Sequence, residues 1–175
     1  MKLTEFDSNV IEFVEPTKKN DNGILFWYLQ NNVLKKEIQL TFEANFIGTN
    51  PGFKKGQDVL LLEVTDAFTD VVGKIEEHFR SSKSYDPDVK TYDFVFNSEI
   101  KAKLQQTEKG DAYKERGNLT PASVLSLGYQ SLLVVTASFG WYEKTVCEDG
   151  DGEGQGLFMK VRDIRTVSLK RTSRK

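Results

Sequence analysis

Two strand-like runs decide the fold of this chain: Ser131-Leu-Leu-Val-Val-Thr-Ala-Ser-Phe-Gly-Trp-Tyr142 and Gly156-Leu-Phe-Met-Lys-Val-Arg-Asp-Ile-Arg-Thr-Val-Ser-Leu169. Both are rich in β-branched and aromatic residues, and glycines bound the acidic loop between them, so the pattern predicts a long β-hairpin. Alternation in the second run places Phe158, Lys160, Arg162 and Ile164 on one face. Aromatic and basic side chains interleaved on a strand are typical of a surface that stacks bases and neutralises phosphates.

Earlier segments predict more strands. Ile24–Gln30 is a strong strand, and Asn31-Asn32 favours a tight turn into an alternating strand over Val33–Phe46, so we expect these two strands to form a hairpin. Further strands are expected at Asp58–Val64 and at Tyr92–Asn97, with Ile100–Leu104 as an extension of the latter past a bulge.

One helix is expected after the Asp58–Val64 strand. Thr65 or Asp66 can cap its N-terminus, and the helix should end near Arg80. Apolar residues then recur at helical spacing, at Phe68, Val71, Val72, Ile75 and Phe79.

These elements predict a mainly β protein with one inserted helix. A Greek-key barrel of the oligonucleotide-binding (OB) type fits the pattern, and a β-sandwich is the alternative. We expect residues 1–169 to form a single OB-like domain, with 81–91 and 105–120 as flexible excursions and 170–175 as a basic tail. A chain of 175 residues can bury a core without disulfides or metal.

Charge is distributed unevenly along the chain. The formal net charge is −2. Residues 160–175 hold seven basic residues against the single acid Asp163, which makes this segment strongly basic and the rest acidic. Such asymmetry indicates a basic ridge or tail that meets an anion, or a solubilising terminus.

Catalytic signatures are weak. The single histidine, His78, lies near the predicted C-terminal end of the helix, where a positive imidazole has a structural role. The single cysteine, Cys147, lies among acids that raise a thiol pKa, and it excludes an intrachain disulfide. We therefore expect a protein that is not an enzyme and has no cofactor.

Two acidic clusters are candidate metal sites. Asp149, Asp151 and Glu153 have the spacing of the first ligands of a calcium loop, but the twelfth position is Lys160, which excludes an EF-hand. Asp86, Asp88 and Asp93 could hold magnesium in a metal-dependent nuclease, although acids in surface loops are common. No metal site is predicted.

Aromatic residues beside lysines give the candidate binding residues. Phe26, Trp27 and Tyr28 are consecutive in a strand, so Trp27 must face away from its two neighbours. The residues predicted to stack bases are Trp27, Phe53, Trp141 and Tyr142. Those predicted to contact phosphate are Lys35, Lys36, Lys54, Lys55, Lys160, Arg162 and Arg165.

A family resemblance is carried by Leu127-Gly128 leading into Ser131–Val135, by Phe139-Gly-Trp-Tyr142 and by Gly154-Gln-Gly-Leu-Phe-Met-Lys-Val-Arg-Asp-Ile164. On these residues the C-terminal third resembles single-stranded DNA-binding proteins of bacteriophages and large DNA viruses with an OB fold. One departure is the basic end, Lys170-Arg-Thr-Ser-Arg-Lys175, because many family members end in an acidic tail that recruits replication partners.

The resemblance implies sequence-independent binding of single-stranded DNA during replication, recombination or repair. It implies single-stranded DNA or RNA and replication proteins as partners. The single cysteine and an N-terminus without a signal-peptide pattern lead us to expect a location in the cytoplasm or nucleus, in the host cell if the protein is viral. No membrane association is expected, because the apolar runs are too short to span a bilayer. The alternative is a β-sandwich interaction or structural protein that binds no nucleic acid.

Overall fold

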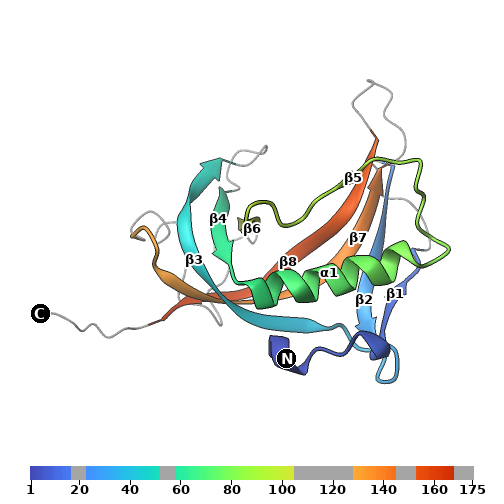
Figure 1. The fold of residues 1–175 in the computed structure, drawn as a ribbon, viewed down its shortest axis with the longest axis horizontal. Coiled ribbons are helices and arrows are strands. Elements are labelled where there is room, and N and C mark those ends of the chain that lie inside the picture. The colour runs from blue at the N-terminus through green and yellow to red at the C-terminus, as the bar shows by residue number, and fades with distance from the viewer. Residues whose placement is uncertain (17–22, 52–57, 105–127, 145–152, 168–175) are drawn as a thin grey trace, which may run out of the picture.

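The computed structural model describes residues 1–16, 23–51, 58–104, 128–144 and 153–167. These residues form a mainly β protein in which one α-helix packs on an eight-stranded sheet (Figure 1). The strands are β1 (Ile11–Val14), β2 (Ile24–Asn31), β3 (Gln39–Pro51), β4 (Asp58–Val64), β5 (Thr91–Tyr92), β6 (Glu99–Leu104), β7 (Leu132–Lys144) and β8 (Gly154–Thr166). The helix is α1 (Asp66–Arg80), and two short 3₁₀ turns, Leu3–Glu5 and Ser8–Val10, precede β1.

The predicted C-terminal hairpin is confirmed, and its first strand organises the sheet. β7 pairs with β8 along its whole length in antiparallel register, from Leu133 opposite Thr166 to Lys144 opposite Gly154. Its other edge is shared, because β3 pairs with the first half and β2 with the second half. Figure 1 shows β7 and β8 running side by side through the molecule.

The predicted hairpin between the second and third strands is wrong. β2 pairs with β1 and β7, and β3 pairs with β4 and β7, so the two strands follow one another along the same edge of β7. Beside the turn, an isolated bridge joins Gln30 to Glu37, which precedes β3, and the backbone N–H of Ile38 donates to the carbonyl of Leu29 at 3.3 Å. The physical reason is that β7 is long enough to supply backbone hydrogen-bond partners to both strands. The turn between β2 and β3 leaves Val33 and Leu34 exposed.

Five of the eight strands pair consecutively within the sheet. The pairing runs β6–β4–β3–β7–β8, and every neighbouring pair is antiparallel. Some Cα atoms of β6 and β8 lie within 8 Å of each other, but no backbone ladder joins the two strands in the described part of the chain. All eight strands belong to one hydrogen-bonded sheet, so the described residues do not form two separate sandwich sheets.

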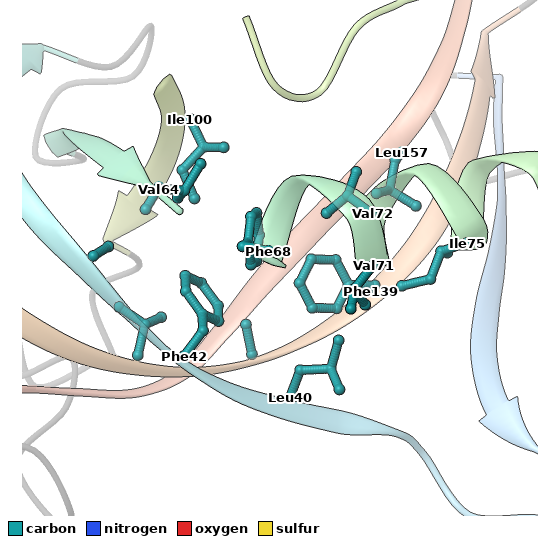
Figure 2. Packing of buried hydrophobic residues seen from close by; sticks show 14 of the residues in the cluster. Leu40, Phe42, Val64, Phe68, Val71, Val72, Ile75, Ile100, Phe139 and Leu157 are labelled. Carbon is teal, nitrogen blue, oxygen red and sulfur yellow. The ribbon is translucent and has the colours of Figure 1, made fainter. Parts of the chain in front are cut away.

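The helix follows the sequence prediction closely. Thr65 is the N-cap, and its side chain accepts a hydrogen bond from the backbone N–H of Phe68 at 3.2 Å. The five predicted apolar residues are the buried residues of α1: Phe68, Val71, Val72, Ile75 and Phe79. Figure 2 shows this face of α1 against Leu40, Phe42, Phe139 and Leu157 of the sheet.

The segment after α1 crosses back to β8. Of the predicted Tyr92–Asn97 strand, only Tyr92 belongs to a regular strand, β5 (Thr91–Tyr92), which pairs in parallel with Gln155 and Gly156. Gln155 is fully buried, and its side-chain amide donates to the carbonyls of Asp86 and Val89 at 2.6 and 2.9 Å. Part of the predicted 81–91 excursion is therefore tied to the core, whereas residues 105–120 and 170–175 lie outside the described residues.

No helix within the described ranges is long and apolar enough to cross a membrane.

Candidate nucleic-acid interface

The sheet has one face toward α1 and one face away from it, which we call the outer face. Trp27 points toward α1, with its ring centroid 5.1 Å from that of Phe79. Because side chains alternate along a strand, Phe26 and Tyr28 of β2 point to the outer face. Tyr28 is 49% exposed, so a large aromatic ring is available to solvent there.

Three aromatic rings from two strands meet on the outer face. The centroid of Phe158 lies 5.4 Å from that of Phe26 and 5.9 Å from that of Tyr28, both in edge-on geometry. Phe26 and Tyr28 lie 6.5 Å apart in a stacked arrangement. We call Phe26, Tyr28 and Phe158 the aromatic platform: Tyr28 is exposed and the other two are half-buried, and aromatic rings that solvent reaches offer a surface for bases.

Glycine on the central strand makes this meeting possible. Gly140 of β7 lies between Tyr28 and Phe158 in the register, so β2 and β8 flank it. A β-carbon at Gly140 would come within 2.6 Å of the Phe158 ring. Phe158 can therefore lie across β7 only because residue 140 has no side chain.

The outer face carries a second pair of aromatic residues beside the platform. Tyr142 is directly opposite Phe26 on β2 and Gly156 on β8. A β-carbon at Gly154 would lie 2.6 Å from the ring of Tyr92, so Tyr92 covers this glycine. The ammonium of Lys90 lies 4.9 Å from the centroid of Tyr92, a cation–π contact.

Tyr142 keeps its proton across the biological pH range. Burial, with a smaller contribution from Tyr92, raises the pKa of the Tyr142 hydroxyl above its usual value. Its half-buried ring can pack against a ligand while the neutral hydroxyl donates a hydrogen bond.

Basic residues continue the outer face along β8. Lys160 is two residues after Phe158 and lies opposite Ser138 of β7. Arg162 also contacts Ser138, because its Nε donates a hydrogen bond to Ser138 Oγ at 3.2 Å. Arg165 is exposed and pairs with Asp163 of its own strand, at 2.9 Å between Nη2 and Oδ2. The structure thus brings three predicted phosphate contacts onto one strand.

Two predicted lysines lie at the turn between β2 and β3. Lys35 donates to Glu12 of β1 at 2.8 Å, and this hydrogen bond is the main reason that the pKa of Glu12 is lowered. Lys36 is exposed and has no ion pair among the described residues. Phe53, Lys54 and Lys55, which were also predicted, lie outside the described residues.

Both tryptophans are in the core, which is incompatible with their predicted role in stacking bases. Trp141 is fully buried and Trp27 is 5% exposed. Trp141 stacks on Phe79 of α1 at 4.4 Å, and its Nε1 donates to Gln155 Oε1 at 3.1 Å. The strands need these large rings to fill the space under α1, so neither tryptophan can reach a ligand.

The sequence predictions missed the platform itself. Alternation established that Phe26 and Tyr28 share a face opposite Trp27, but it did not say which face is buried. The available signal was glycine inside a strongly predicted strand, at Gly140, because such a glycine marks a close approach by another group. The described residues contain no group of three or more histidine, cysteine or acidic residues that could hold a metal.

A scan of the chain against protein-family models finds no match, and searches of curated proteins and of solved structures find no significant match.

Proposed function

We propose that the protein binds single-stranded nucleic acid on the outer face of its sheet, without reading sequence. The observation that carries the proposal is the aromatic platform with Lys160 and Arg162 on the same face of β8. Bases would stack on Tyr28 and Phe158, and the two cations would contact the phosphates. Stacking tolerates any base because every base has a π-face.

The arrangement favours single strands over duplex. Tyr28 and Phe158 offer rings, and bases in a duplex are stacked on one another and present only their edges. The Lys160 side chain has no ion pair within the described ranges. Its ammonium can therefore contact a phosphate near the rings. We expect single-stranded DNA as the first ligand, and RNA is the alternative substrate of the same chemistry.

The strand order supports an OB-type architecture for part of the sheet. β3, β4 and β6 pair consecutively, and β7 returns through a long connection to lie beside β3, which is the Greek-key order. β8 then follows β7 and approaches β6. We propose that these five strands form a partly open barrel of the OB type, and that β2 and β1 extend it along β7.

A salt-dependent binding assay tests the function. Fluorescence anisotropy of a labelled oligo-dT of about 30 bases would be followed at about 50 and about 200 mM salt, with duplex DNA as the control. If Lys160 and Arg162 each neutralise one phosphate, the log–log slope is about −1.4, or roughly sevenfold weaker binding at the higher salt. Equal affinity for duplex, or no binding at the lower salt, contradicts the proposal.

A further inference from the structure

Glu37 holds a carboxylate against the basic part of the outer face. Arg162 Nη2 donates to its Oε1 at 2.6 Å, and Gln39 Nε2 donates to its Oε2 at 2.9 Å. Both oxygens therefore have a partner. Burial alone would raise the pKa of Glu37, but the hydrogen bonds from Gln39 and Arg162 outweigh it, so the pKa is lowered and the group is ionised.

The groups around this carboxylate come from three strands. Gln39 of β3, Ser138 of β7 and Lys160 of β8 are direct neighbours in one row across the sheet. Arg162 joins the row through its hydrogen bond to Ser138. We call these four residues the anion cluster: Gln39, Ser138, Lys160 and Arg162.

The chemistry of the anion cluster suits an oxyanion with more oxygens than a carboxylate. Arg162 offers guanidinium donors and Lys160 offers an ammonium, and both are charged at neutral pH. The hydroxyl of Ser138 accepts from Arg162 Nε, which leaves its own proton to donate. A phosphodiester can use these donors together, whereas Glu37 has, within the described part of the chain, hydrogen bonds from Arg162 and Gln39 only.

The position of the anion cluster matches the platform. Lys160 follows Phe158 by two residues on the same face, which is about 7 Å along the strand. A nucleotide whose base stacks on Phe158 therefore has its phosphate within reach of the cluster. Glu37 and Arg162 remain accessible, since their side chains are 35% and 36% exposed.

We propose that the anion cluster is a phosphate subsite and that Glu37 fills it in the free protein as an internal competitor. This inference rests on the proposed function, because the incoming phosphate belongs to a strand bound on the platform. An exposed ion pair of this kind shifts an equilibrium by no more than about fivefold. A phosphate can therefore displace Glu37, and Glu37 lowers the affinity by a similar factor.

The substitution Glu37→Gln tests the competitor. We expect E37Q to bind oligo-dT about two- to fivefold more tightly than the wild type at low salt, with a log–log salt slope steeper by about 0.7. The matched control is Asp70→Asn on α1, which changes the net charge equally on the other side of the sheet. Equal tightening in D70N, or unchanged or weaker binding in E37Q, would overturn the inference.

Arg162→Ala in the E37Q background tests whether the gain passes through the cluster. We expect the double variant to lose the gain of E37Q, because the residue that Glu37 releases is gone. A gain that persists without Arg162 would show that Glu37 acts through general repulsion of the strand, against the inference.

A titration with inorganic pyrophosphate separates failure of the subsite from failure of the proposed function. The readouts are the backbone amide shifts of Ser138 and Lys160 and the side-chain Nε–H of Arg162, by NMR. We expect E37Q to show saturable shifts at lower pyrophosphate concentration than the wild type. Absent shifts in E37Q would overturn the subsite even if oligo-dT binds, and clear shifts without oligo-dT binding would reject only the proposed function.

Discussion

The ring of Phe158 lies over Gly140 of the neighbouring strand, at the place that a side chain at residue 140 would occupy. A β-carbon there would lie 2.6 Å from two ring atoms of Phe158 and would also collide with the backbone carbonyl of Trp27. We predict that Gly140→Ala destabilises the protein by about 1–3 kcal/mol, as overpacking does elsewhere. Urea denaturation of the purified variant measures the change.

Gly73 gives the matched control for this substitution. It lies in α1, is exposed, and has no atom within 4 Å of an added β-carbon. Because alanine has the higher helix propensity, Gly73→Ala should stabilise the protein by up to about 1 kcal/mol. Equal effects of the two substitutions would contradict the packing of Phe158 on Gly140.

Tyr28 should contribute to the affinity for oligo-dT but little to the stability of the folded protein. We predict that Tyr28→Ala weakens oligo-dT binding by about 1–3 kcal/mol, which is roughly 5- to 150-fold, because one stacked base is lost. The midpoint of unfolding should move little, since the ring is 49% exposed. Anisotropy titrations and thermal melts measure the two quantities.

Tyr129 is the control for the tyrosine substitution. It is 71% exposed and lies just before the N-terminal end of β7, whereas Gly140 lies in the second half of that strand. Tyr129→Ala should leave the affinity unchanged. If both variants lose affinity equally, or if neither does, the platform is not where bases stack.

How far the sequence determines the structure differs between elements. The helix and its buried face could be predicted, with Thr65 or Asp66 as the cap, because capping and the spacing from Phe68 to Phe79 are local properties. The hairpin of β2 with β3 could not be excluded locally, because alternation does not say which strand supplies the partner. That choice depends on the length of β7, which is a property of the whole sheet.

The site shows the same division between local and global information. Alternation separated Trp27 from Phe26 and Tyr28, yet both faces of β2 are aromatic, so the pattern alone could not say which one meets α1. Arg162 was correctly placed beside Lys160, but its ion pair with Glu37 joins residues 125 positions apart. Long-range contacts of this kind leave no periodic signal in the sequence.

Tryptophan fluorescence should report little of the binding. Because Trp27 and Trp141 are buried, we predict a blue-shifted emission maximum and only slight quenching when oligo-dT saturates the protein. Emission spectra across an anisotropy titration check this. Strong quenching at saturation would place a tryptophan in the binding site and contradict the described core.

Gln155 should be important for stability, because it is a fully buried polar residue whose side chain donates two hydrogen bonds and accepts one. Gln155→Leu would leave Trp141 Nε1 and the carbonyls of Asp86 and Val89 without this partner. We predict a loss of about 2–5 kcal/mol in the free energy of unfolding. Faster hydrogen exchange at residues 86–90 would show where the loss acts.

The exposed Gln39 is the control for Gln155. Gln39→Leu should change the free energy of unfolding by less than about 0.5 kcal/mol, because the amide of Gln39 that is lost is already exposed to water in the folded protein. A loss for Q155L as small as this would show that the hydrogen bonds from Gln155 to the carbonyls of Asp86 and Val89 contribute nothing to stability.

Glu76 gives a pH-dependent prediction with a definite sign. Burial is the largest influence and raises its pKa above 4.5; Asp93 acts in the same direction, while Arg80 and the backbone N–H of Phe94 oppose the rise. Its Oε2 is buried and has no hydrogen-bond partner among the described residues. The folded state therefore binds this proton more tightly than the unfolded state, so stability falls as pH rises from 4.5 through the folded pKa.

We predict that Glu76→Gln raises the melting temperature at about pH 7 and removes this part of the pH dependence. Thermal melts from about pH 4 to 8 check it, with Asp70→Asn as the exposed control; parallel profiles for E76Q and the wild type would contradict the prediction.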